Sequence, residues 1–182
     1  MLDAEQGKTL VYLARAAIAG ELGFAAHELP RGDWLEQPGA TFVTLTLHGR
    51  LRGCIGSLEA YRPLIDDVRD NAVAAFRDPR FDPLSKTEFA EVLVDVSLLS
   101  KPEAMRFNSE QDALEQLHPG RDGVILECGG HRATFLPQVW AQLQQPQVFL
   151  RHLKNKAGLA EEFWSDDIKL SRYTVQKWRE GE

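Results

Sequence analysis

The sequence is poor in the residue patterns on which several large classes of function depend. It contains two cysteines in 182 residues, Cys54 and Cys128, and neither belongs to a Cys-x-x-Cys pair. A radical-S-adenosylmethionine enzyme needs three closely spaced cysteines for its iron–sulfur cluster, so this chain cannot be one. His-x-x-His, His-Glu-x-x-His and Gly-x-Gly-x-x-Gly patterns are also missing. We therefore expect no bound metal and no cofactor.

Basic residues are fewer than acidic ones, and the sequence has no long apolar run. The net charge is −6 and the pI is near 5.4, whereas nucleic-acid-binding domains usually carry a basic patch. No apolar run approaches the length of a membrane span, and Met1–Glu5 lacks the basic and apolar regions of a signal peptide. These absences predict a cytoplasmic protein with reduced thiols and with neither nucleic acid nor membrane as a partner.

The pattern of apolar residues predicts an α+β fold in one domain over residues 1–182. Helical periodicity alternates with short hairpin patterns, without the regular β-α-β order of a doubly wound sheet, so we expect an antiparallel or mixed sheet with flanking helices. Helices are predicted at 3–23, 63–78, 109–118, 137–143 and 146–156. Strands are predicted at 41–47, 51–58, 91–100, 123–128, 132–135 and 168–178, the last with a bulge near Ser171.

The most informative segment is Leu51-Arg52-Gly53-Cys54-Ile55-Gly56-Ser57, which places a cation and a thiol two residues apart in a predicted strand. Residues two apart in a regular strand share a face. Gly53 and Gly56 leave room for another backbone or a small ligand. The preceding turn leaves the register open. A two-residue turn puts Arg52 and Cys54 on the face of Val43, whereas a three-residue turn puts them on the face of the threonines.

A second informative segment is the two-proline loop Asp78-Pro79-Arg80-Phe81-Asp82-Pro83-Leu84. Two prolines hold its side chains with little entropy left to lose. Asp78, Arg80 and Phe81 are candidate ligand-binding residues opposite Arg52. The alternative is that the segment ends the preceding helix and holds a structural salt bridge.

Five ordered blocks resemble the AmmeMemoRadiSam system protein A family, the bacterial and archaeal branch of the AMME-syndrome candidate protein domain. They are Leu51–Ser57; Phe76–Phe81 with Pro83-Leu84; Val96–Leu99; Asp122–Val124 with Arg132–Trp140; and Phe149-Leu150 with Lys156–Leu159 and Trp164. The resemblance implies two unequal lobes, or sub-lobes of the single domain, around a cleft. It also implies association with a Memo-like protein and a radical-S-adenosylmethionine protein. It does not supply a reaction.

Cys54 is the candidate catalytic residue, because a neighbouring arginine favours the thiolate. Lining a ligand site or packing in the strand are its alternatives, and His48 is a possible partner across the hairpin. Arg52 can grip a small anionic ligand through a carboxylate or phosphate, with Gly53 and Gly56 beside it. Alternatively, Arg52 pairs with Asp78 or Asp82. The preferred function is a small-molecule-binding or accessory protein, and an enzyme with a Cys54 nucleophile is the other possibility.

Overall fold

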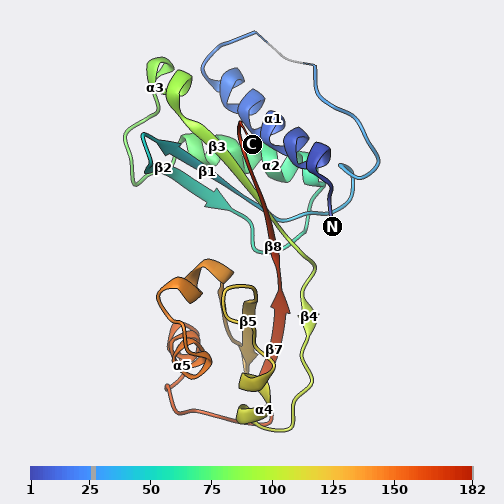
Figure 1. The fold of residues 1–182 in the computed structure, drawn as a ribbon, viewed down its shortest axis with the longest axis vertical. Helices are drawn as coiled ribbons and strands as arrows, with labels where there is room; N and C mark the ends of the chain where they lie inside the picture. Colours follow the sequence, from blue (N-terminus) through green and yellow to red (C-terminus); the bar gives the residue numbers. More distant parts are fainter. Residues whose placement is uncertain (26–27, 182) are drawn as a thin grey trace. The chain divides into compact units, whose positions relative to one another are not determined.

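The computed structural model describes residues 1–25 and 28–181 and divides the chain into two compact units. Unit 1 comprises Met1–Leu99 and Gln176–Glu182, and unit 2 comprises Ser100–Val175. Unit 2 is therefore inserted in the sequence of unit 1, between its last two strands. Each unit carries one four-stranded sheet with helices, which confirms the α+β class (Figure 1).

Unit 1 is built from a sheet with strand order β2-β1-β3-β8. Its elements are α1 (Ala4–Glu21), β1 (Thr41–Leu47), β2 (Arg50–Gly56), α2 (Leu64–Phe76), α3 (Lys86–Glu91), β3 (Leu93–Leu99) and most of β8 (Val175–Arg179). The helix α1 begins where expected, since Asp3 and Gln6 form a capping box. α1 and α2 cover one face of the sheet (Figure 1). Between them lies a core that includes Leu10, Leu13, Val43, Leu45, Val68, Val94 and Val96.

Unit 2 is built from a sheet with strand order β4-β7-β5-β6. Its elements are β4 (Glu103–Ala104), α4 (Glu110–Glu115), β5 (Gly123–Cys128), β6 (His131–Phe135), the 3₁₀ helix η1 (Pro137–Ala141), α5 (Pro146–Lys156) and β7 (Lys169–Tyr173). Gly129 and Gly130 adopt the positive φ angles that the tight β5–β6 turn requires. The core contains Leu126, Leu150 and Leu153, together with Trp140 stacked on Phe149.

The expected strand over 168–178 is wrong. It is two strands, β7 and β8, which are interrupted at Thr174 and belong to different sheets. No bulge occurs at Ser171, because β7 pairs with β5 in unbroken register from Lys169 to Tyr173. The apolar phase shifts because Leu170 and Tyr173, three residues apart on β7, are buried on opposite faces of the strand. Leu170 lies in the core of unit 2, and the Tyr173 hydroxyl contacts Thr134 and the carbonyl oxygen of Phe135. The helix α3 was not expected either, although Ser85 and Glu88 form a capping box at its start.

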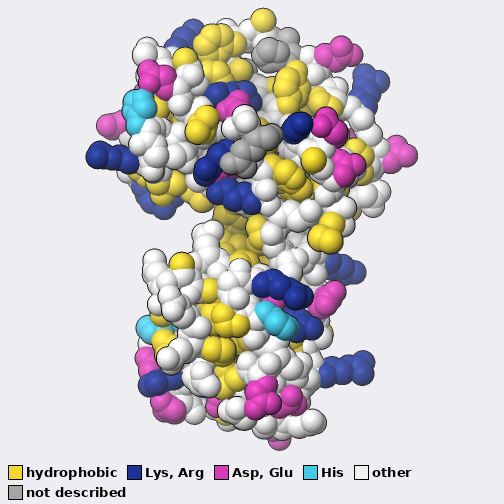
Figure 2. Space-filling model, viewed as in Figure 1, with side chains coloured by type: hydrophobic (Ala, Val, Ile, Leu, Met, Phe, Trp, Pro, Cys, Tyr) yellow, Lys and Arg dark blue, Asp and Glu magenta, His cyan; other side chains and the backbone are white. Residues whose placement is uncertain are grey.

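Side chains of both charge signs are interspersed over the visible face of each unit (Figure 2). Among the helices formed by the described residues, none has the length and apolar content that crossing a membrane requires.

Candidate functional site

The β1–β2 hairpin combines a two-residue turn with a bulge. His48 and Gly49 form the turn with φ angles of 50° and 76°, and Leu47 pairs with Arg50. Thr46 pairs with Leu51 and Leu45 pairs with Gly53, so Arg52 has no partner on β1 and is the bulged residue. A two-residue turn was expected to place Cys54 on the face of Val43. The bulge shifts the register by one and places Cys54 opposite Thr44 instead.

Cys54 is half-buried on the face of the sheet opposite the Val43–Leu45 core. The Thr44 hydroxyl donates a hydrogen bond to its Sγ over 3.4 Å. The expected approach of His48 to Cys54 is wrong, because the His48 Nε2 atom lies 2.7 Å from a carboxylate oxygen of Glu91. The hydrogen-bond partner of the thiol is therefore a hydroxyl and not an imidazole.

Arg52 is engaged in an ion pair with two parallel hydrogen bonds. Its Nε and Nη2 atoms donate to the two carboxylate oxygens of Glu88, over 2.9 and 3.2 Å. The expected partners Asp78 and Asp82 were wrong, because the bulge directs Arg52 toward the start of α3. The Arg52 side chain is only 13% exposed. An anionic ligand would have to replace the Glu88 carboxylate in order to bind this guanidinium in the same way.

Asp78 and Arg80 bind the backbone of Cys54. The Cys54 N–H donates to Asp78 Oδ2 over 2.9 Å, and Arg80 Nη2 donates to the Cys54 carbonyl oxygen over 3.0 Å. The two side chains also pair with each other, with Arg80 Nη2 2.6 Å from Asp78 Oδ2. The hydrogen bonds from Arg80 hold the pKa of the buried Asp78 carboxyl far below its usual range, although burial opposes this shift.

Phe81 lies close to both arginines of this cluster. Its ring centroid is 5.9 Å from the Cζ atom of Arg52 and 5.7 Å from that of Arg80. Guanidinium groups at this distance from an aromatic ring are attracted to it electrostatically. The structure thus brings together five of the predicted site residues: Arg52, Cys54, Asp78, Arg80 and Phe81.

The two glycines of the motif are packed against the protein itself. A Cβ atom on Gly53 would lie 2.3 Å from the carbonyl oxygen of Ala75 at the end of α2. On Gly56 it would lie 2.3 Å from the Phe42 ring and 2.5 Å from the Thr41 carbonyl oxygen. Of the two possibilities raised by the sequence, the backbone approach is what the structure shows at Gly53.

Sequence reasoning missed Glu88, which joins the hairpin to α3. Its carboxylate accepts from the backbone N–H of Ser85 over 2.9 Å as well as from Arg52. The hydrogen bonds from Arg52 are the main reason why the pKa of Glu88 falls to about 2, and the Ser85 N–H adds to the effect. The signal was available, since Ser85-Lys86-Thr87-Glu88 has the spacing of a capping box.

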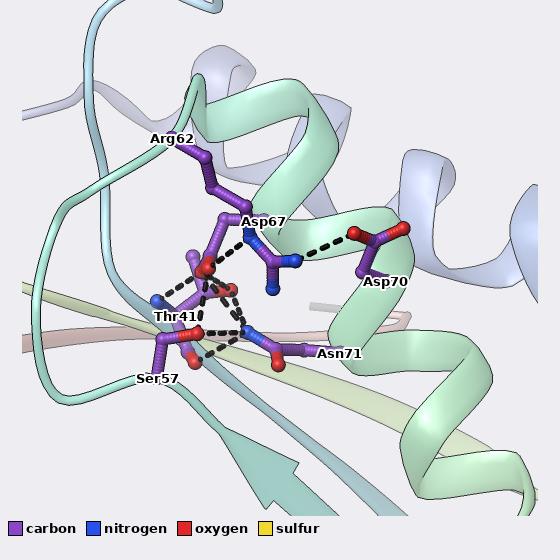
Figure 3. A network of polar contacts seen from close by, with 6 residues as sticks. All are labelled: Thr41, Ser57, Arg62, Asp67, Asp70 and Asn71. Carbon is purple, nitrogen blue, oxygen red and sulfur yellow. Dashed lines mark hydrogen bonds and ion pairs between the residues drawn. The ribbon is translucent and has the colours of Figure 1, made fainter.

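A second missed cluster surrounds Asp67, which is fully buried on α2 (Figure 3). Its carboxylate accepts hydrogen bonds from both the backbone N–H and the hydroxyl of Thr41, each over 2.7 Å. It also accepts from Ser57 over 2.6 Å, from Arg62 over 2.9 Å and from Asn71 over 3.0 Å. This network ties the segment after β2 to α2 and β1. The i, i+4 spacing of Asp67 and Asn71 on an apolar helix face was its sequence signal.

The hairpin offers a half-buried thiol flanked by two internal ion pairs, Arg52 with Glu88 and Arg80 with Asp78. Over residues 1–25 and 28–181, no buried side-chain nitrogen or oxygen lacks a hydrogen-bond partner. Within the same ranges, no group of three His, Cys, Asp or Glu side chains is arranged to hold a metal ion.

The two-unit α+β fold defines a class that includes a protein of known structure. The chain is similar to the crystal structure of the uncharacterized protein PH0010 from Pyrococcus horikoshii, with a TM-score of 0.82 and 32% identity over 99% of this chain and 94% of the other. The AMMECR1 family model matches residues 11–178, and the chain belongs to this family. The resemblance expected from the Leu51–Ser57 motif is thereby confirmed.

Curated archaeal relatives support the same assignment over the whole chain. Protein MJ0810 of Methanocaldococcus jannaschii is 35% identical, and the match covers 100% of this chain and 94% of the relative. A protein of Methanothermobacter thermautotrophicus is 37% identical, with 98% and 96% covered.

Proposed function

We propose that the protein is an accessory, ligand-binding component that acts with a Memo-like protein and a radical-S-adenosylmethionine protein. The Cys54 hairpin is the element that it offers to a ligand or partner. These partners come from the family resemblance. The environment of Cys54 supports a binding role for this chain.

The observation that carries the proposal is the contact between Cys54 Sγ and the Thr44 hydroxyl. A nucleophilic cysteine is usually activated by an adjacent base, and a threonine hydroxyl is not a base near neutral pH. His48, the candidate base from the sequence, is paired with Glu91 instead. A thiol in this setting is better suited to contact a bound molecule than to attack one.

A small anionic ligand remains part of the proposal, with Arg52 as its binding group. Such a ligand competes with Glu88 for the same guanidinium. Binding would then release Glu88 from Arg52 and loosen the start of α3, because Glu88 also caps that helix. Ligand binding at Arg52 is in this way linked to the order of α3.

An enzyme with a Cys54 nucleophile is the second candidate. It is favoured by the position of Arg80, whose guanidinium binds the carbonyl oxygen of Cys54 itself. A nearby cation stabilises a thiolate and can activate a cysteine without an imidazole.

Co-purification and complementation distinguish the two candidates. The tagged chain is co-expressed with the Memo-like and radical-S-adenosylmethionine proteins of its own genome, and each variant is also tested in a deletion strain. We expect both proteins to be retained by the wild type and by Cys54→Ser, with Cys128→Ser as the matched thiol control. An inactive Cys54→Ser beside an active Arg52→Ala would establish the enzyme instead. Failure of the wild type to retain either protein would refute the proposed association.

The pair Arg52→Ala and Glu88→Gln tests the anionic ligand. Both variants break the same ion pair, but only Glu88→Gln leaves the cation in place. With inorganic phosphate and a dicarboxylate as probes in titration calorimetry, we expect Glu88→Gln to bind more tightly than wild type and Arg52→Ala to bind more weakly. Equal weakening in both variants would show that the pair is structural.

A further inference from the structure

At the β2 edge of the unit 1 sheet, side chains bind main-chain groups of Cys54. β2 is an outermost strand of the order β2-β1-β3-β8. An edge strand directs the N–H and C=O groups of alternate residues away from the sheet, where another chain can pair with them. At Cys54 both groups bind the loop that follows α2 and not β1.

Asp78 and Arg80 supply the hydrogen-bonding groups that a neighbouring strand would supply. A paired strand presents one acceptor to the N–H of a residue and one donor to its C=O. Asp78 Oδ2 is the acceptor for Cys54 over 2.9 Å, and Arg80 Nη2 is the donor over 3.0 Å.

The ion pair of Asp78 and Arg80 is held by burial and by further hydrogen bonds. The Asp78 side chain is 1% exposed, and its Oδ1 atom accepts from the backbone N–H and the Nε atom of Arg80. Proteins commonly use charged side chains at a sheet edge to prevent pairing with other chains. The low pKa of Asp78 keeps this charge in place at physiological pH.

The pairing that this arrangement blocks is self-complementary. A residue with one outward donor and one outward acceptor can exchange both bonds with the same residue of a second copy, about a two-fold axis. Leu51, on the same strand, is 47% exposed and would gain cover from such a neighbour. We propose that Asp78 and Arg80, by occupying the main-chain N–H and C=O of Cys54, prevent the chain from pairing through β2 with a second copy of itself.

Removal of both side chains tests this role. The full-length double variant Asp78→Ala, Arg80→Ala is compared with the wild type by sedimentation under reducing conditions. Arg77→Ala with Asp82→Ala is the matched control, because it removes the same charges nearby without touching β2. We expect the wild type and the control to be monomeric and the double variant to form a dimer. The dimer dissociation constant of the double variant should be at least about tenfold lower than that of the wild type, because the dimer gains two main-chain hydrogen bonds.

Oxidation locates the contact. Antiparallel pairing centred on Cys54 places the two Cα atoms about 5.5 Å apart, within the range of a disulfide. Oxidised glutathione would then accept the two electrons and two protons of the thiol pair. We expect a covalent dimer in the double variant, and its loss when Cys54→Ser is added. A folded double variant that stays monomeric, or one whose dimer crosslinks equally well with Cys54→Ser, would overturn the proposal.

A milder variant covers the case in which the double variant does not fold. Arg80→Met frees only the Cys54 carbonyl and leaves the bond from its N–H to Asp78. We expect it to dimerise more weakly than the double variant but more tightly than the Arg77, Asp82 control. A folded Arg80→Met variant that forms no more dimer than that control would equally refute the proposal that Asp78 and Arg80 block self-pairing.

Discussion

Replacement of Gly53 is the most direct test of how the hairpin meets α2. The Cβ atom of an alanine would lie 2.3 Å from the Ala75 carbonyl oxygen and 3.5 Å from a methyl carbon of Leu45. The first distance is far below van der Waals contact, and the neighbour is backbone, which cannot rotate away. Either β2 or the end of α2 has to move, and overpacking of this kind typically costs about 1–3 kcal/mol.

We expect the urea midpoint of unfolding to be highest for wild type, lower for Gly53→Ala and lowest for Gly53→Val, because the branched side chain needs more room. The four tryptophans provide the fluorescence signal for denaturation in urea. Gly20→Ala is the matched control, because a Cβ atom there meets nothing within 4 Å and the residue lies inside α1. It should stabilise by about 0.5–1 kcal/mol through helix propensity. A Gly53→Ala midpoint equal to or above that of wild type would refute the close contact with Ala75.

Three further predictions concern two ion-paired carboxylates and the expected absence of metal. Asp67→Ala should destabilise by about 3–5 kcal/mol in urea denaturation, because Arg62 and several donors lose a buried partner; a loss no larger than that of exposed Asp70→Ala would contradict this. Glu88, whose folded pKa is about 2 against 4.5 normally, should contribute stability above pH 4.5 that is lost as the pH falls toward 2. Glu88→Gln should flatten the stability profile in that window, and an unchanged profile would exclude the Arg52 pair as its cause. Elemental analysis of the dialysed protein should find no stoichiometric zinc or iron; one equivalent of either would disprove the prediction.

Local sequence signals predicted most elements correctly. Asp3 with Gln6 gave the start of α1, and Gly129-Gly130 gave the β5–β6 turn, because such signals act within a few residues of the chain. The division of 168–178 into two strands was not predictable in this way. Alternation of apolar residues shows which side chains are buried, but it does not show that the two halves are buried in different cores.

The structure brings predicted residues of the candidate site together, but it places Arg52 and Cys54 differently than the sequence suggested. The motif residues Arg52 and Cys54 do lie near Asp78 and Arg80, since both segments carry restricted, side-chain-specific sequences. The partner of Arg52 could not be predicted, because a bulge depends on pairing between strands and changes the direction of a side chain without changing its spacing. The Glu88 signal was present, but α3 has only six residues and little apolar periodicity.

The insertion of unit 2 between β3 and β8 imposes an order on synthesis. The sheet of unit 1 needs β8, and the last residues also anchor α1: Arg15 binds Glu180 over 2.8 Å, and Gly7 leaves room for the Trp178 ring. All of unit 2 leaves the ribosome before these residues do. Until β8 has been synthesised, the β3 edge of the unit 1 sheet therefore has no β8 to pair with, although all of unit 2 has already been synthesised. Most of unit 1 is synthesised before unit 2, but its sheet can be completed only after unit 2 has been synthesised.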